Sequence, residues 1–214
     1  MDIKINLKDS QIIDFEQDVS VFIGGSTGSG KTFFIKKMIY ELVSKNTPNE
    51  IVFFIVDTKL IEFKENEYTS FLFKDFIYKP KKKEDFQFVL GKIKKLFEDR
   101  KEFFEKEIKG DTSLNKISFP HVFIIFDEYA DFVLFQEKFK QDILEILSYP
   151  NIKELGLNLI FSTQQTFSSN IVDKIYQICE KKIIFNLIES KEENSLNVEK
   201  ALELKTGEYL VLNK

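Results

Sequence analysis

The chain has 214 residues, 43% of them hydrophobic, with 8 glycines, 4 prolines and a net charge of −4. This length supports one good hydrophobic core, and no low-complexity linker divides it, so we expect a single domain over residues 1–214. The net charge excludes a generally basic surface for polyanions, and a lone cysteine, Cys179, excludes an internal disulfide framework.

No apolar run approaches the roughly 18 to 20 residues that a membrane span needs. Residues 1–11 alternate apolar with charged or polar side chains, which is unlike a signal peptide. Together with the single cysteine, this pattern indicates a protein without a membrane span in a reducing, cytoplasmic compartment.

The first predicted unit is a strand, a glycine-rich loop and a helix. The apolar run Val19–Ile23 leads into the loop, and helical periodicity follows over Phe33–Val43. The loop reads Gly25, Ser26, Thr27, Gly28, Ser29, Gly30, Lys31, Thr32. Its glycines let backbone N–H groups wrap around a triphosphate, with the positive end of the helix behind them. Lys31 adds a charge for the β- and γ-phosphates, and the Thr32 hydroxyl is placed to ligate Mg²⁺.

The next apolar run, residues 51–56, ends at Asp57 and Lys59, whose chemistry alone indicates no definite role. The basic cluster Lys79–Lys83 follows. It could contact phosphates, but a charge run beside proline is more typical of a solvated loop, and we favour that interpretation.

A helix is predicted over residues 85–108, with an apolar stripe at three- and four-residue spacing that includes Arg100. Arg100 is the only arginine among 31 basic residues. Its stem can pack in the stripe while its head reaches water. Alternatively, its planar fork reaches a phosphate on its own loop or a neighbouring subunit's, and stabilises charge during γ-phosphoryl transfer. On the second interpretation Arg100 is a candidate catalytic residue.

Two acids end the buried-type strand predicted over residues 122–126. An aspartate at this strand tip, Asp127, can hold Mg²⁺ through water beside the Thr32 hydroxyl. The adjacent Glu128 can act as general base by orienting the water that attacks the γ-phosphate. The alternative is a strand that simply ends in solvated acids.

Another core strand, over residues 157–162, leads to hydroxyl and amide side chains. A neutral amide there, Gln164 or Gln165, could sense the γ-phosphate or hold the attacking water. These side chains could also merely leave the strand for solvent. A helix over residues 138–147 and strands over 182–187 and 208–212 complete the pattern, and Thr206–Tyr209 is predicted to turn into an edge strand. Strands alternating with helices predict an α/β sandwich with a mainly parallel central sheet and ligands at its carboxyl edge.

Five segments in this order resemble the motor domain of the FtsK/SpoIIIE family, within the FtsK/HerA superfamily of hexameric DNA pumps. Ile23–Thr32 is similar to the family's Ala-Gly-x-Thr-Gly-Ser-Gly-Lys-Ser loop, Val56–Glu62 to its Asp-Pro-Lys segment, Asp99–Phe104 to its Glu-Arg-Arg-Tyr motif, Phe126–Phe132 to its Asp-Glu-Phe-Ala-Asp-Leu motif, and Ser162–Gln164 to its Ala-Thr-Gln. The last match selects Gln164 as the polar sensor. The chain departs from the family at Thr58, where proline is usual, and at Gln165, where arginine is usual.

The resemblance implies a RecA-like P-loop NTPase fold in three layers that binds ATP and Mg²⁺. It also implies translocation of double-stranded DNA through a homohexameric ring, with each active site completed by a neighbouring subunit. Pore loops are expected within residues 61–76 and 132–141. We expect no room for a membrane anchor or a winged-helix domain, so an accessory DNA-recognition or membrane-anchored protein is a possible partner.

The resemblance leaves the biological process open among segregation, conjugative transfer and genome packaging, with a mobile-element or viral setting favoured. Two other function classes compete. A small nucleotide kinase closes several arginines over the transferred phosphate, which a chain with one arginine cannot do. A protein-secreting relative is the second alternative, and stimulation of hydrolysis by DNA would distinguish it from a DNA motor.

Overall fold

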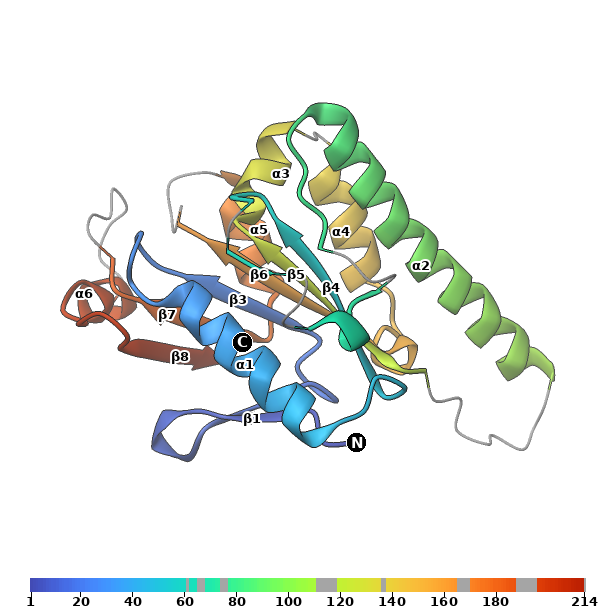
Figure 1. Ribbon diagram of the computed structural model, residues 1–214, viewed down its shortest axis with the longest axis horizontal. Coiled ribbons are helices and arrows are strands. Elements are labelled where there is room, and N and C mark those ends of the chain that lie inside the picture. The colour runs from blue at the N-terminus through green and yellow to red at the C-terminus, as the bar shows by residue number, and fades with distance from the viewer. Residues whose placement is uncertain are drawn as a thin grey trace.

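A six-stranded sheet forms the centre of the computed structural model, in the order β4-β5-β6-β3-β7-β8 (Figure 1). The structure describes residues 1–60, 62–64, 68–73, 77–110, 119–135, 138–164, 170–187 and 196–213. The strands are β3 (Ser20–Gly24), β4 (Ile51–Asp57), β5 (His121–Asp127), β6 (Leu157–Thr163), β7 (Lys181–Phe185) and β8 (Tyr209–Asn213). Only β8 runs antiparallel, against β7. The predicted α/β fold with a mainly parallel sheet is confirmed.

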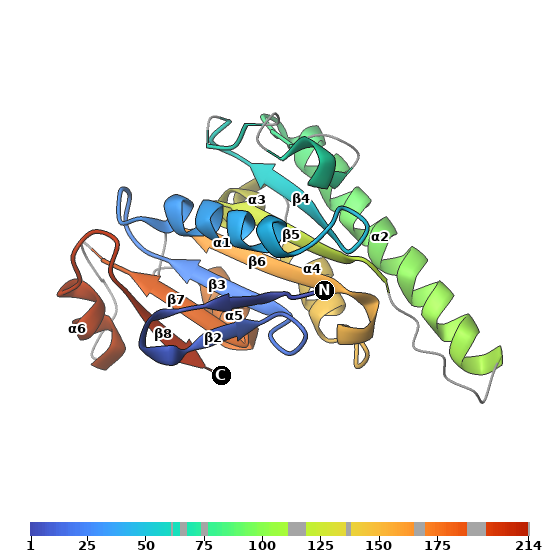
Figure 2. The same cartoon turned by 60° about the horizontal axis from the view of Figure 1, so that its bottom comes forward.

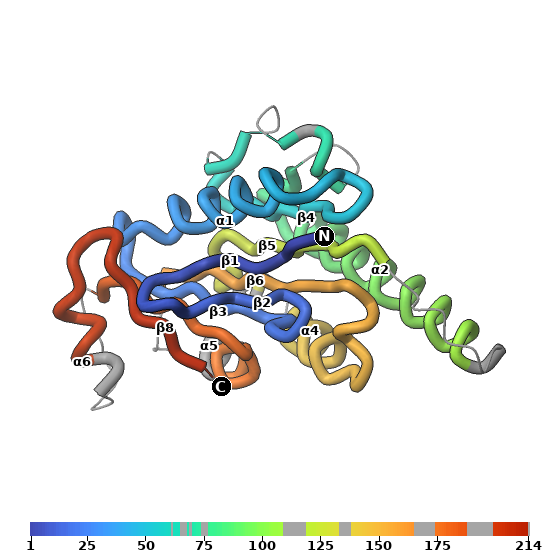
Figure 3. The backbone as a smooth tube through the Cα atoms, turned by 90° about the horizontal axis from the view of Figure 1, so that it is seen from below, coloured from blue at the N-terminus to red at the C-terminus, as the bar shows by residue number. Residues whose placement is uncertain are grey.

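Helices cover both faces of the sheet because its central strands are apolar on both sides. One face carries α1 (Lys31–Lys45) and a small hairpin, β1 (Lys4–Asn6) with β2 (Ile12–Asp14). The other carries α2 (Lys83–Gly110), α3 (Tyr129–Phe135), α4 (Phe139–Leu147) and α5 (Asn170–Ile178). Figure 2 shows these layers, with α6 (Leu196–Leu202) at the β7–β8 side, and Figure 3 shows the hairpin beside α1. Short 3₁₀ turns occur at Lys8–Ser10, Thr69–Phe71 and Lys153–Leu155.

Two hydrophobic clusters, one on each face, fix these layers. Successive strand residues point to opposite faces, so Val21 joins the α1 side while Phe22 joins the α2 side. On the α2 side, Phe126 stacks on Phe161 of the neighbouring strand with ring centroids 5.4 Å apart. Among the described residues, no helix is both long enough and apolar enough to cross a membrane.

The strand register sets the position of the functional residues. In β4 and β5, Asp57 lies beside Asp127, and in β3 and β6, Gly24 lies beside Thr163. Because these strands are parallel, all four tips lie at the same edge of the sheet. The sequence segments that carry polar motifs therefore converge there.

The hairpin, like α3, α5 and α6, was not predicted as an element from the sequence. Residues 1–11 do alternate apolar with polar side chains, but each hairpin strand has only three residues, which is short for a strand assignment. Its loop relies on left-handed backbone at Asp9 and Ser10 instead of glycine. The sides of the hairpin that face α1 bury Ile5 and Ile13 in the core.

Candidate active site

The glycine-rich loop joins β3 to α1 at the carboxyl edge of the sheet. Gly25 has a φ of +155°, and a Cβ there would lie 2.7 Å from the Phe185 Cβ and from the Ser29 Oγ. Gly30 has a φ of +114°, and a Cβ there would lie 3.3 Å from the Gly207 Cα. Side chains at either position would therefore distort the loop or its supports.

Lys31 extends its ammonium group into the curve of this loop. Its Nζ donates to the carbonyl oxygens of Gly25 at 2.6 Å and Ser26 at 2.8 Å. Burial, aided by the nearby Lys59 charge, lowers the pKa of Lys31 to about 8. The buried Ser29 Oγ has no hydrogen-bond partner in the described part of the chain. A buried cation beside an unsatisfied hydroxyl suits phosphate oxygens, which accept from both.

Asp127 ends β5 with its side chain almost wholly buried, at 1% exposure. Its Oδ2 has no hydrogen-bond partner among the described residues, while its backbone oxygen accepts from the Thr58 Oγ1 at 2.9 Å. Burial raises the pKa of Asp127 to about 6, against the opposing charge of Lys59. An unsatisfied carboxylate oxygen at this edge fits Mg²⁺, which needs few protein ligands beside phosphate and water.

No group of three or more His, Cys, Asp or Glu side chains that could hold a metal occurs in the described ranges. A Mg²⁺ site of the predicted kind would use one carboxylate, the Thr32 hydroxyl and substrate oxygens, and needs no cage of protein side chains. Thr32 lines a pocket of about 260 Å³ together with Lys31 and Thr27.

Glu128 follows Asp127 with a left-handed backbone, φ 66°, and an exposure of 8%. Its Oε1 accepts a hydrogen bond from the Thr163 Oγ1 at 2.6 Å. The backbone N–H of Gln164 reaches both carboxylate oxygens at 3.0 Å. The Gln164 Oε1 in turn accepts from the Thr27 Oγ1 in the glycine-rich loop at 2.6 Å. The structure therefore links the predicted base, the predicted sensor and the loop in one chain of contacts.

Sequence reasoning left Asp57 and Lys59 without roles, and the structure gives them places. The buried Asp57 carboxylate accepts backbone N–H groups from Leu60 and Glu62 at 2.9 Å and from Phe63 at 3.2 Å. It thereby shapes the loop that brings Lys59 and Glu62 to the wall of the phosphate pocket. An aspartate just past a strand is a turn-forming signal, but only the fold shows which pocket the turn faces.

A second pocket of about 300 Å³ adjoins the loop on the α1 side. Its lining includes Lys8, Gly30, Phe33, Phe34, Gly207 and Tyr209. The Tyr209 ring packs against Phe34 with centroids 5.4 Å apart, and the Gly207 N–H donates to the Ser29 oxygen at 2.9 Å. The predicted turn at residues 206–209 therefore touches the glycine-rich loop, which its sequence gave no reason to expect.

Arg100 lies away from this edge. Its Nη1 donates to the carbonyl oxygens of Leu155 at 2.6 Å and Gly156 at 3.1 Å, and its Cζ lies 5.1 Å from the centre of the Phe119 ring. Leu155 and Gly156 precede β6, so the guanidinium sits at the amino edge of the sheet, about 20 Å from the carboxyl edge at 3.3 Å per residue. Burial lowers the pKa of Arg100 to about 10.

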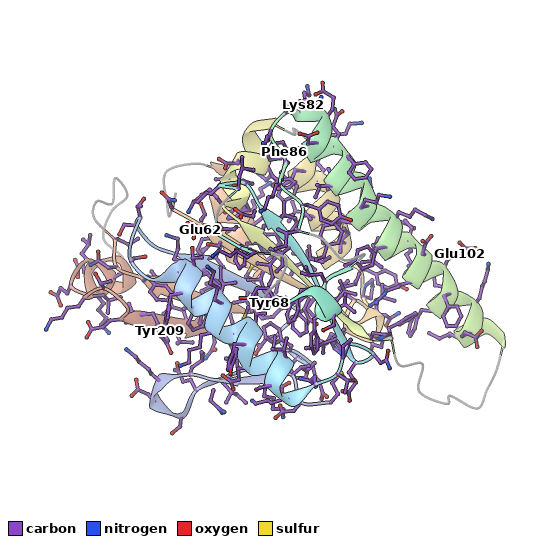
Figure 4. All side chains as sticks on the ribbon, viewed as in Figure 1. Glu62, Tyr68, Lys82, Phe86, Glu102 and Tyr209 are labelled. Carbon is purple, nitrogen blue, oxygen red and sulfur yellow. The ribbon has the colours of Figure 1, made fainter. Side chains whose placement is uncertain are left out.

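The expectation that Arg100 reaches a phosphate on its own chain is therefore wrong. The apolar stripe does bury the stem, as the alternative required, but backbone carbonyls hold the head in place of water. Figure 4 shows the same separation: Glu62 lies near the start of α1, whereas Glu102, two residues from Arg100 in α2, lies well away from it. A contact with a neighbouring subunit stays a prediction.

Two other expectations concern loops. The basic cluster leads directly into α2, where the Lys81 and Lys82 N–H groups donate to the Asp85 Oδ2 at 3.0 and 3.2 Å. The expected pore-loop stretches, 61–76 and 132–141, lie partly outside the described residues. Gln165 lies outside them altogether.

Comparison with known proteins identifies the chain's relatives. The model of the FtsK/SpoIIIE family matches residues 6–113, just over half of the chain. The DNA translocase FtsK of Leptospira interrogans (strain Fiocruz L1-130) is 25% identical over 189 residues, covering 84% of this chain and 20% of that protein. The chain therefore spans about a fifth of the length of this curated relative.

Solved structures share the fold. The pCW3 conjugation coupling protein TcpA with ATPγS has a TM-score of 0.71 at 16% identity, covering 98% of this chain and 62% of that one. ATPases 2 and 3 of EssC from Geobacillus thermodenitrificans have a TM-score of 0.69 at 18% identity, covering 96% and 39%.

The genome packaging NTPase B204 of Sulfolobus turreted icosahedral virus 2, also with ATPγS, has a TM-score of 0.52 at 16% identity and covers 92% of both chains. At these identities the three structures establish the P-loop ATPase fold, and the sequence match establishes the family. The chain is a member of the FtsK/SpoIIIE family.

Proposed function

We propose that this chain is an ATP-hydrolysing motor that translocates double-stranded DNA. The observation that carries the proposal is the convergence of Lys31, Asp127 and Glu128 at one sheet edge, with Glu128 tied to the loop through Gln164. These are the parts that phosphoryl transfer to water requires: a charge for the phosphates, a carboxylate for the metal and a base for the nucleophile.

Each residue has a defined task in this reaction. The backbone N–H groups of residues 25–32 and the Lys31 ammonium hold the β- and γ-phosphates. Thr32 and Asp127 would hold Mg²⁺, which neutralises charge on the phosphate oxygens when bound. Glu128 accepts a proton from the attacking water as the bond between the γ-phosphorus and the bridging oxygen breaks, which yields ADP and phosphate. Gln164 is placed to respond to the γ-phosphate because its side chain already contacts Thr27 of the loop.

We also propose that the apolar pocket beside Gly30 takes the nucleobase. It adjoins the loop where α1 begins, and aromatic rings of Phe33 and Tyr209 contribute to its lining. Such rings offer faces on which a base stacks. The pocket volume of about 300 Å³ is at the lower end of ordinary ligand sites.

DNA as the substrate is supported by the relatives, whose printed names include DNA translocases, a conjugation coupling protein and a genome packaging NTPase. We propose assembly as a homohexameric ring, since a chain with a net charge of −4 needs an assembled or local basic surface to contact DNA. For the process we propose conjugative transfer or genome packaging for a mobile element or virus, which the printed names of TcpA and B204 support, with segregation as the alternative. The cytoplasm remains the predicted location.

The likeness to the Type VII secretion ATPase EccC of Thermomonospora curvata, with a TM-score of 0.64 at 16% identity, supports a second candidate, an ATPase that drives protein secretion. The test is steady-state ATP hydrolysis by the wild type and by Glu128→Gln, with and without linear double-stranded DNA, at low and moderate salt. We expect DNA to stimulate the wild type, and Glu128→Gln to bind ATP without hydrolysing it. If DNA leaves the rate of ATP hydrolysis unchanged at every salt concentration, a protein substrate is favoured instead.

A further inference from the structure

The side chain of Thr163 occupies a position that its sequence context did not mark. It ends β6, is fully buried at 0% exposure, and donates its hydroxyl proton to the Glu128 Oε1 at 2.6 Å. Hydrogen bonds to an ionised acceptor are short and strong, so this contact is a principal restraint on the Glu128 carboxylate.

Glu128 needs such a restraint. A left-handed backbone at a residue other than glycine or asparagine is uncommon and persists only where surrounding contacts fix it. The Gln164 N–H lies 3.0 Å from both carboxylate oxygens. This one shared donor would leave the carboxylate free to tilt. A second donor that bonds to one of the two oxygens defines the orientation of the carboxylate.

The two oxygens of Glu128 are therefore unequal. Within the described part of the chain, Oε1 accepts from two donors, the Thr163 hydroxyl and the Gln164 N–H, while Oε2 accepts from the Gln164 N–H only. A carboxylate has about four acceptor positions in all, so Oε2 keeps the larger share of its capacity for another hydrogen bond.

We propose that Thr163 is the positioning residue of the general base, and that its hydroxyl holds Glu128 so that Oε2 takes the proton of the attacking water. This inference rests on the proposed ATPase function and adds a residue to it. Thr163 itself touches neither nucleotide nor water in this role. Its effect passes entirely through the orientation of Glu128.

Two substitutions separate the hydroxyl from the shape of the side chain. Thr163→Val keeps the branched shape and removes the donor, whereas Thr163→Ser keeps the donor and removes a methyl group. Ser162→Ala is the matched control, because the Ser162 hydroxyl is buried at the same strand tip without a partner among the described residues. Thermal melts confirm that each variant is folded. Equilibrium titration with a fluorescent ATP analogue measures the affinity of the glycine-rich loop for nucleotide.

We expect Thr163→Val to lower kcat by about 10- to 100-fold, the range for a misplaced catalytic group, while KM and analogue binding stay within about twofold. Thr163→Ser and Ser162→Ala should retain kcat within about threefold of the wild type. A kcat for Thr163→Val equal to the wild type, or an equal loss in Thr163→Ser, would overturn the positioning role alone. A folded wild type that hydrolyses no ATP would overturn the proposed function and this inference together.

Discussion

Replacing Asp127 by asparagine should stabilise the nucleotide-free protein while abolishing hydrolysis. The carboxylate is 1% exposed with an unsatisfied oxygen, and burial raises its pKa from 3.8 to about 6. A shift of about two pKa units corresponds to about 3 kcal/mol of lost stability above pH 6, at 1.36 kcal/mol per unit. Asparagine keeps the shape of the side chain without the buried charge. About 3 kcal/mol is therefore an upper bound for the stability that Asp127→Asn gains.

The sign of the pH dependence follows from proton binding. Between pH 4 and pH 6 the folded chain keeps the Asp127 proton that the unfolded chain releases, so the contribution of Asp127 to wild-type stability falls as pH rises through this window and is constant above it. The advantage of Asp127→Asn should thus be full at pH 7.5, about half at pH 5 and absent near pH 4.

Thermal denaturation in EDTA measures this difference. For a chain of this size, each kcal/mol raises Tm by about 2–4 °C, so we expect a gain of about 4–10 °C at pH 7.5. Asp57→Asn is the matched control: Asp57 is equally buried one strand away, but three backbone N–H groups satisfy it, so its replacement should lower stability by about 1–3 kcal/mol. An Asp127→Asn variant that melts at or below the wild-type temperature at pH 7.5 would refute the reasoning.

Three further predictions concern the loop and the single arginine. Burial lowers the pKa of Lys31 to about 8, and bound phosphates should favour its protonated form, so ATP binding at pH 8.5 should take up protons. Calorimetry would show this uptake as a binding heat that varies with the ionisation enthalpy of the buffer. Lys31→Met should abolish the uptake. Gly30→Ala should cost about 1–3 kcal/mol in denaturant unfolding because of its φ of +114° and the close Gly207 backbone; the reasoning fails if Gly91→Ala, where nothing crowds a Cβ, costs as much. Arg100→Ala should lower stability by about 1–3 kcal/mol through the two freed carbonyls. A wild-type ATPase rate for assembled Arg100→Ala would exclude a role at a neighbouring subunit's site.

Local sequence patterns were enough to predict the loop, the two acids and the alternation of strands with helices. These features are local: backbone wrapping around phosphate needs glycines at fixed spacing, and a strand covered on both faces needs an unbroken apolar run. Asp127 and Glu128 could be named because they follow such a run directly. The family resemblance added Gln164, which the structure then placed against Thr27 and Glu128.

Contacts between neighbouring strands could not be predicted without the folded structure. The order of β5, β6 and β3 brings Thr163 to Glu128, 35 residues away in the chain, and no spacing rule connects the two. The same holds for Arg100. The sequence predicted its place in the apolar stripe of a helix, but the edge of the sheet that its guanidinium reaches depends on how α2 crosses the strands. Periodicity reports the face that a residue presents, whereas the register and direction of packed elements determine what that face meets.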